Sequence, residues 1–168
     1  MKYHKINVNL FIKNRKKFVA MMKPNSVAFF NSNDIYPISA DSTLPFEQHR
    51  DIFYLSGIDQ EESILMLCPN ATDSNYREVL FLKETNEHIA IWEGEKLTKE
   101  QAFETSGIKT VCWLEEMEKI IESLVTNCEN IYYNHNEHYR ANVEVETRED
   151  RFNKWNLSSL VSTSTLAL

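Results

Sequence analysis

The stretch from Ser39 to Gly57, SADSTLPFEQHRDIFYLSG, places charged residues directly beside aromatic residues. Aromatic and aliphatic side chains are commonly buried, whereas Asp, Glu and Arg are mostly exposed unless they are paired. A surface loop does not need this many aromatic rings, and a core strand does not accept this many charges. The composition therefore predicts a segment that enters the core while its polar side chains make specific contacts. We expect Phe53, Tyr54 and Leu55 to enter a β-sheet.

Two apolar runs follow this stretch, Ser63 to Cys68 and Glu78 to Leu82. The residues between them, Pro69 to Asn75, are typical of a turn. Together with Ile52 to Leu55, the two runs predict three consecutive strands joined as a meander. Because the runs are almost continuously apolar, both faces of the sheet must be covered, and we expect helices to cover them.

The flanking segments supply helices and further strands. Helices are predicted by apolar residues three and four positions apart, or by a cap at Thr98 with Gln101 and a stop at Gly107. The predicted elements are a helix from Leu10 to Met22 with a basic exposed face at Lys13 to Lys17, a strand from Ser26 to Asn31, a helix after Thr98, a strand from Val111 to Leu114, a helix from Glu115 to Thr126, a strand from Asn130 to Asn134, and a helix from Glu137 to Trp155. This order predicts a three-layer α/β domain with a mixed β-sheet covered by helices on both faces.

The length of 168 residues is that of one domain, which we place at residues 1–156. The last segment, residues 157–168, consists of small, hydroxylic and uncharged residues, and it resembles the start of a connection.

The net charge of -7 argues against capture of nucleic acid or anionic lipid, since both need clustered cations. No apolar run is long enough to span a membrane and no signal peptide is recognisable, so we expect a cytoplasmic protein. Cys68, Cys112 and Cys128 are widely spaced, and we expect buried free thiols.

Few residues have the pattern of a catalytic or metal site. His135 and His138 are three apart, as ligands on a helix can be, but no further ligand completes a set, and surface or capping roles explain them better. The chain has neither a nucleophile elbow nor a phosphate-binding glycine loop. Two residues remain. Trp92 either protrudes beside Gly94 as an interface or ligand-site ring or folds back over the domain, and Asp41 is either a turn cap with Ser39 or Ser42 or a positioned carboxylate.

Several of these motifs occur in an order that resembles a known family. They are Ser39-Ala40-Asp41-Ser42, Pro45-Phe46 with Gln48, Phe53-Tyr54-Leu55 with Gly57, the apolar strands Ile64 to Leu67 and Val79 to Leu82, and Trp92-Glu93-Gly94. As a set, they resemble the N-terminal domain of aminopeptidase P, the Xaa-Pro aminopeptidase of the creatinase, prolidase and aminopeptidase pita-bread metallopeptidase group. The resemblance runs from the first helix to about Trp155. One departure is Glu47, because the family pattern leads us to expect Arg directly before Gln48.

The resemblance implies an α/β N-terminal domain and places catalysis in a C-terminal pita-bread domain. In that domain two Asp, one His and two Glu hold a pair of divalent metal ions, usually manganese, which hydrolyse the bond before a proline in second position. We assign no catalytic residue and no metal ligand to this chain, and we expect it to be inactive alone. Its expected partners are its own C-terminal catalytic domain, the neighbouring subunits of a homo-oligomer and the peptide substrate.

By the same resemblance, Asp41 and Trp92 are expected to reach an active-site cleft. The domain itself is expected to serve subunit assembly and to narrow access to the active site. Two alternatives remain open: a stand-alone binding module of the same fold, and the N-terminal domain of a prolidase, which cleaves Xaa-Pro dipeptides.

Overall fold

The computed structural model describes residues 5–39, 42–86, 88, 91, 94–125 and 128–135, and the backbone of 164–167. Six strands form the main sheet of this part of the chain, in the order β6-β5-β4-β1-β7-β8. Their bounds are β1 Ser26–Asn31, β4 Ser63–Leu67, β5 Glu78–Leu82, β6 Thr110–Trp113, β7 Asn130–Tyr133 and β8 Ser164–Ala167. The pairs β1–β4 and β4–β5 are antiparallel, and β1–β7, β5–β6 and β7–β8 are parallel. The sheet is therefore mixed, as predicted.

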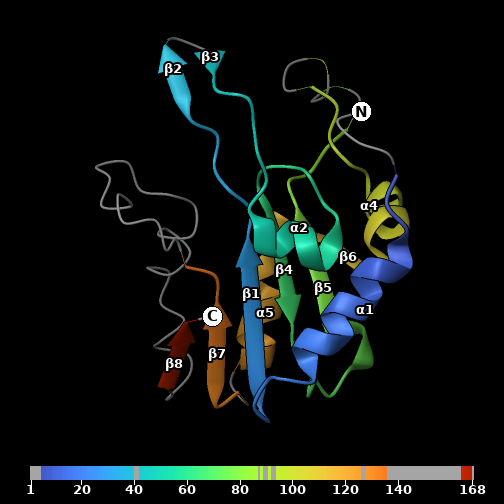
Figure 1. Cartoon of the computed structure of the whole chain (residues 1–168), viewed down its shortest axis with the longest axis vertical. Coiled ribbons are helices and arrows are strands. Elements are labelled where there is room, and N and C mark those ends of the chain that lie inside the picture. The colour runs from blue at the N-terminus through green and yellow to red at the C-terminus, as the bar shows by residue number, and fades with distance from the viewer. Residues whose placement is uncertain are drawn as a thin grey trace.

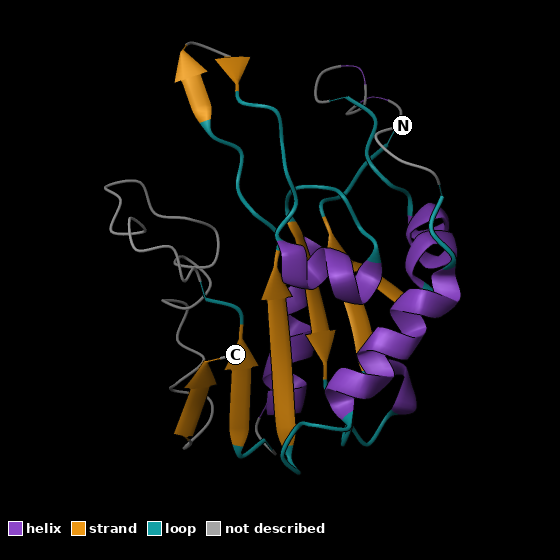
Figure 2. Cartoon of the chain, viewed as in Figure 1, coloured by secondary structure: helices purple, strands orange, loops and turns teal. Residues whose placement is uncertain are grey.

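Helices cover both faces of this sheet (Figure 1). The helices α1 Val8–Val19, α2 Arg50–Ser56 and α4 Lys99–Ser106 lie over one face, and α5 Met117–Val125 lies over the other. Two 3₁₀ turns, η1 Ser74–Tyr76 and η2 Leu114–Glu116, join strands to their neighbours. Figure 2 shows the resulting three layers, with the strands between the two sets of helices.

Alternate residues of each central strand supply two separate cores. Val27 and Phe29 of β1 pack in the cluster that includes Ile121 of α5. Ala28 and Phe30 point the opposite way, into the cluster that includes Ile52 of α2. All of these side chains are buried. Since successive strand residues point to opposite faces, a run without polar interruption requires cover on both sides. The predicted three-layer architecture is confirmed.

The prediction that Ile52 to Leu55 form a strand is wrong, because these residues belong to helix α2. Ile52 and Leu55 are three apart, which places both on one helical face, and both are buried. Tyr54 falls on the outer face and is 55% exposed. His49 caps the first turn, and Gly57 ends the helix in the left-handed conformation with φ 73°. The expected meander therefore does not form: the β4–β5 hairpin pairs with β1 instead.

The sequence led us to expect a uniformly exposed basic face on α1. The structure differs from this expectation. Lys13, Lys16 and Lys17 are exposed, but Arg15 is 1% exposed. Its Nη1 donates to the carbonyl oxygens of Leu55 and Ser106, each at 2.9 Å, and its Nε donates to Glu78 Oε2 at 2.9 Å. One buried guanidinium thus joins α1 to the C-terminal ends of α2 and α4.

The helices α2 and α4 end in the same way, with the tripeptide Ser-Gly-Ile. Ser56 and Ser106 each donate their hydroxyl to a carbonyl four residues earlier and accept the amide of the residue two positions later. Gly57 and Gly107 both have φ 73°. Helix α1 lies directly on these turns, because a Cβ built at Gly57 would be 2.4 Å from the Phe11 ring. The close approach requires glycine.

Other sequence predictions have clear outcomes. The capping box at the start of α4 is present, with Thr98 and Gln101 bonded to each other's backbone amides. The predicted helix from Glu137 to Trp155 lies outside the described residues. Within residues 157–168, predicted to be a connection, Ser164–Ala167 form β8 beside β7, and the domain boundary stays a prediction. In the portion that the structure describes, no helix combines the length and the apolar character needed to cross a membrane.

Candidate functional site

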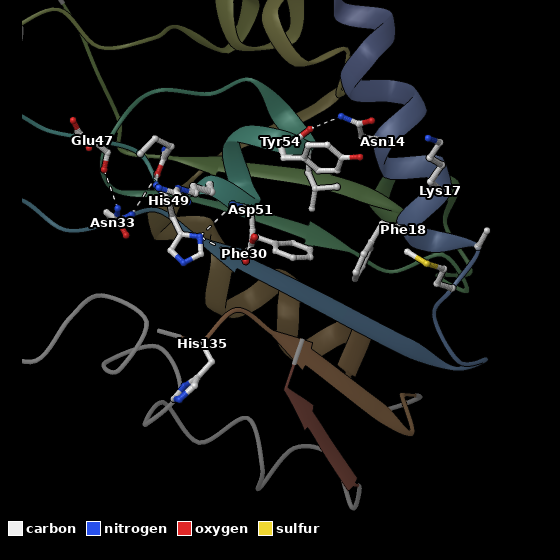
Figure 3. Close-up of a pocket in the computed structure, with 15 residues that line it drawn as sticks. Asn14, Lys17, Phe18, Phe30, Asn33, Glu47, His49, Asp51, Tyr54 and His135 are labelled. Atoms are coloured by element: carbon white, nitrogen blue, oxygen red, sulfur yellow. Dashed lines mark hydrogen bonds and ion pairs between the residues drawn. The ribbon is translucent and has the colours of Figure 1, made fainter. Parts of the chain in front are cut away.

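An open groove of about 1250 Å³ lies between α1, α2 and the loops that follow β1 and β7 (Figure 3). Its wall on one side is largely apolar, with Phe18 from α1, Met21 from the turn after α1 and Tyr54 from α2. The other end is polar and carries Asn33 and His135 from the loops after β1 and β7. Seven of its fifteen lining residues come from the stretch whose mixed composition attracted attention in the sequence: Glu47, Gln48, His49, Arg50, Asp51, Tyr54 and Leu55.

Gln48 holds the segment before α2 in place. Its Oε1 accepts the amides of His49 at 2.7 Å and Asn33 at 3.3 Å, and its Nε2 donates to the carbonyl of Gln60 at 2.8 Å. Asn33 Nδ2 in turn donates to the carbonyl of Glu47 at 2.9 Å. A single amide side chain thus links the loop after β1 to the loop before β4, which explains why polar residues are needed in a segment that enters the core.

The charges of the groove are mixed in sign. Lys17 and Arg50 are opposed by Glu47 and Asp51 among the lining residues. His49 Nδ1 accepts the amide of Asp51 at 3.3 Å and lies 3.7 Å from the Asp51 carboxylate. Because the signs balance, the groove has no strong preference for an anion or a cation. Its chemistry suits a chain segment with both apolar and polar groups.

A second feature is a hairpin that projects away from the main sheet (Figure 1). It consists of β2 Pro37–Ser39 and β3 Ser42–Thr43, paired antiparallel. Four apolar side chains on or beside it are exposed by 37% to 58%: Ile35, Tyr36, Ile38 and Leu44. Exposed apolar groups gathered on a projecting element are typical of a contact surface.

The two predicted site residues, Asp41 and Trp92, both lie outside the described residues. The neighbours of Asp41 are placed, since Ser39 pairs with Ser42 across the hairpin. The neighbour of Trp92, Ile91, is 74% exposed. The roles of Asp41 and Trp92 therefore stay predictions.

The histidine pair considered as a metal site has a partial outcome. His135 is exposed and lines the groove, while His138 lies outside the described residues. Glu61 forms an ion pair with Lys96, and Glu62 pairs with Lys83 at 2.9 Å. Within the described ranges, no three His, Cys, Asp or Glu side chains are arranged to hold a metal ion.

Sequence reasoning missed the α1 side of the groove and the projecting hairpin. The groove residues Lys17, Phe18 and Met21 had been assigned only to an amphipathic helix, because nothing in the sequence shows which segment α1 faces. The strands of the hairpin are three and two residues long, too short for an alternating pattern to be recognised.

The family profile described as aminopeptidase P, N-terminal domain, matches residues 11–132. The match covers most of the chain and includes α1, the central strands and the start of β7. The chain belongs to the aminopeptidase P N-terminal domain family. The resemblance inferred from Asp41, Gln48, Gly57 and Trp92 in their order is thereby confirmed at the level of the family.

Individual relatives agree with this assignment. The Xaa-Pro aminopeptidase of Escherichia coli is 26% identical over 156 residues, which is 93% of this chain and 35% of the relative. Xaa-Pro aminopeptidase 3 of Homo sapiens is 24% identical over 104 residues, covering 61% of this chain and 20% of the relative. The chain thus spans about a third or less of the length of these aminopeptidase P relatives.

Solved structures show the same fold. Aminopeptidase PepP of Pseudomonas aeruginosa superposes with a TM-score of 0.72 at 23% identity, covering 80% of this chain and 30% of that one. Aminopeptidase P of Escherichia coli, solved with the inhibitor Pro-Leu, superposes with a TM-score of 0.69 at 26% identity, with the same coverage of 80% and 30%. The α/β fold with its mixed sheet is therefore that of the aminopeptidase P N-terminal domain.

Proposed function

We propose that this chain is the non-catalytic N-terminal domain of a cytoplasmic Xaa-Pro aminopeptidase and that it serves subunit assembly and narrows access to the active site. The observation that carries the proposal is the family match over residues 11–132, in a chain that spans 35% of the Escherichia coli enzyme. The remaining length of such a relative is where we place the catalytic domain, with its two divalent metal ions, which we propose to be manganese. That metal pair would activate water for hydrolysis of the peptide bond before proline.

The projecting hairpin supports a contact role for this domain. Ile38 and Leu44 are 58% and 52% exposed, and burying such side chains stabilises a complex by about 25 cal/mol for each Å² of apolar surface removed from water. The partners proposed for this surface are the catalytic domain and a neighbouring subunit of the same protein. The hairpin projects from the main six-stranded sheet, so its exposed side chains can contact either partner (Figure 1).

Asp41 and Trp92 are the residues we propose to meet the substrate. Asp41 would attract the free α-amino group of a peptide, because a carboxylate and an ammonium group attract each other. Trp92 would pack against the residues on the proline side of the scissile bond.

The test uses the full-length protein with peptides that carry proline in second position. We expect Trp92→Ala to lower kcat/KM by about tenfold, equivalent to about 1.4 kcal/mol of transition-state stabilisation. Ile91→Ala is the matched control, since Ile91 is adjacent and 74% exposed, and it should leave kcat/KM unchanged. Unaltered kinetics of the Trp92 variant, with an intact oligomer in sedimentation, would contradict the proposed role.

Assays of the full-length protein also distinguish the two alternative functions, prolidase and stand-alone binding module. A strong preference for Xaa-Pro dipeptides over longer peptides would identify a prolidase. Absence of hydrolysis by the full-length protein supplied with Mn²⁺ would favour a binding module. Hydrolysis of longer peptides by the full-length protein, and none by the 168-residue chain, is the result expected for an N-terminal domain of an Xaa-Pro aminopeptidase.

A further inference from the structure

Two of the three cysteines face each other on the α5 side of the main sheet. The Sγ atoms of Cys68 and Cys128 are 4.0 Å apart, although 60 positions separate the residues in sequence. Cys68 directly follows β4, which ends at Leu67, and Cys128 lies between α5 and β7. Both are free thiols. Because neither belongs to a helix or a strand, the two sulfur atoms can approach without breaking a ladder hydrogen bond.

The two thiols differ in exposure and in acidity. Cys68 is 2% exposed and belongs to the core cluster on the α5 side, whereas Cys128 is half-buried at the edge of that cluster. The hydrogen bond shared with Cys128 lowers the pKa of Cys68, against the opposing effect of burial, and the amide of Ala71 lowers it further. The same hydrogen bond, together with burial, raises the pKa of Cys128. These directions favour Cys68 as the thiol of the pair that ionises first.

Cys112 offers an internal comparison. It lies on β6, and burial raises the pKa of its thiol. Among the described residues, Cys112 has no hydrogen-bonded thiol neighbour, in contrast to the facing pair. A reaction that needs a thiolate beside a second thiol is therefore expected at Cys68 and not at Cys112.

We propose that Cys68 and Cys128 form a peroxide-sensitive dithiol that closes to an intramolecular disulfide. The oxidant is hydrogen peroxide. It is small enough to reach a buried sulfur atom, whereas oxidants that are themselves disulfide compounds are too large to approach it. A thiolate with a second thiol in reach is the arrangement of redox-sensing cysteines. Closure requires the sulfur atoms to move from 4.0 Å to a bond length of about 2.05 Å.

The chemistry balances in two steps. The Cys68 thiolate attacks one peroxide oxygen, so that an S–O bond forms, the O–O bond breaks and hydroxide leaves to become water. The Cys128 sulfur then attacks the sulfenic sulfur of Cys68, so that the S–S bond forms and the S–O bond breaks. The departing hydroxide takes up the proton of Cys128 as a second water. Two thiols are oxidised and one peroxide is reduced.

The test treats the reduced full-length protein with equimolar hydrogen peroxide, blocks remaining thiols with N-ethylmaleimide and maps peptides without reduction. We expect a peptide pair linked through Cys68 and Cys128, lighter by two hydrogen atoms, while Cys112 is recovered alkylated. Cys112→Ala is the matched control and should form the same link. In Cys128→Ala, Cys68 should instead accumulate as a sulfenic acid that dimedone traps.

Three results would overturn the proposal. One is oxidation of Cys112 at a rate equal to or above that of Cys68 in the wild-type protein. Another is oxidation of Cys68 to sulfinic acid without any link to Cys128. The third is a link between chains instead of within one. Because all three are measured on the wild-type protein, the outcome does not depend on whether a cysteine variant folds.

Discussion

Replacing Arg15 by Met tests whether one buried guanidinium holds three helices together. The side chain is 1% exposed and makes three hydrogen bonds, to the carbonyls of Leu55 and Ser106 and to the carboxylate of Glu78. Burial lowers the pKa of Arg15 and the nearby Glu78 charge raises it, and the guanidinium remains charged. Met has a similar shape without any donor, so the change removes all three bonds and adds little strain.

The expected cost follows from the groups left behind. Each buried carbonyl that loses its donor costs about 1–3 kcal/mol. The Glu78 side chain is 35% exposed and regains water, so its lost ion pair adds at most about 1 kcal/mol. The loss in free energy of unfolding is therefore about 4 kcal/mol, a large share of the roughly 5–15 kcal/mol of a typical domain.

Urea unfolding of the 168-residue chain, followed by circular dichroism, measures this loss. Glu78→Gln should cost only about 1 kcal/mol, because the two carbonyl bonds of Arg15 remain. Lys16→Met, on the exposed side of the same helix, should change stability by less than about 0.5 kcal/mol. If the Arg15 variant lost less than about 1 kcal/mol, or if Glu78→Gln lost as much as Arg15→Met, the carbonyl bonds would not be the main contribution and the reasoning would fail.

Two further substitutions test local features by the same urea titration. Gly57→Ala should lower the free energy of unfolding by about 3 kcal/mol, since φ is +73° and the new Cβ would lie 2.4 Å from the Phe11 ring. The control is Gly94→Ala, at φ +81° with no neighbouring atom within 4 Å of the new Cβ, which should cost only about 1 kcal/mol. Equal losses in the two variants would exclude a steric contribution from Phe11. Thr98→Ala should cost about 1 kcal/mol by removing the capping box with Gln101, whereas a neutral result would mean that water replaces the cap without loss.

The sequence predicted β1, β4, β5, β6 and β7, because each contains a run of apolar residues long enough to show strand character. It did not predict β8, which lies in residues 157–168, expected to be a connection. β1, β4 and β5 match the predicted bounds within a residue. The capped helix α4 was predicted because its cap and stop residues act within one turn and need no tertiary information. Local chemistry determined these elements.

Features that depend on tertiary contacts could not be predicted. Ile52 to Leu55 is four residues long, and a run of that length fits a helix or a strand equally well. The decisive signal was available further along the chain: Ser56-Gly57-Ile58 has the same residues as Ser106-Gly107-Ile108, where a helix had been predicted. The sequence around Arg15 contains no such signal. Its side chain is buried because it donates to the carbonyls of Leu55 and Ser106, which lie 40 and 91 residues further along the chain.

Two positions of the family motif are required by the fold. Gln48 is required, because its amide joins the loops before β4 and after β1. Gly57 is required by its contact with Phe11. Glu47, where Arg was expected, uses its backbone carbonyl to accept from Asn33, and its side chain is exposed in the groove. Since a carbonyl is common to all residues, the exchange of Arg for Glu leaves this contact intact.

Asp41 and Trp92, the motif residues proposed to meet the substrate, lie outside the described residues. A residue whose role is contact with something outside the domain is not needed for the stability of the domain itself. The distinction is measurable: replacing Gln48 should lower the stability of the 168-residue chain, whereas replacing Trp92 should leave that stability unchanged and alter only the kinetics of the full-length enzyme.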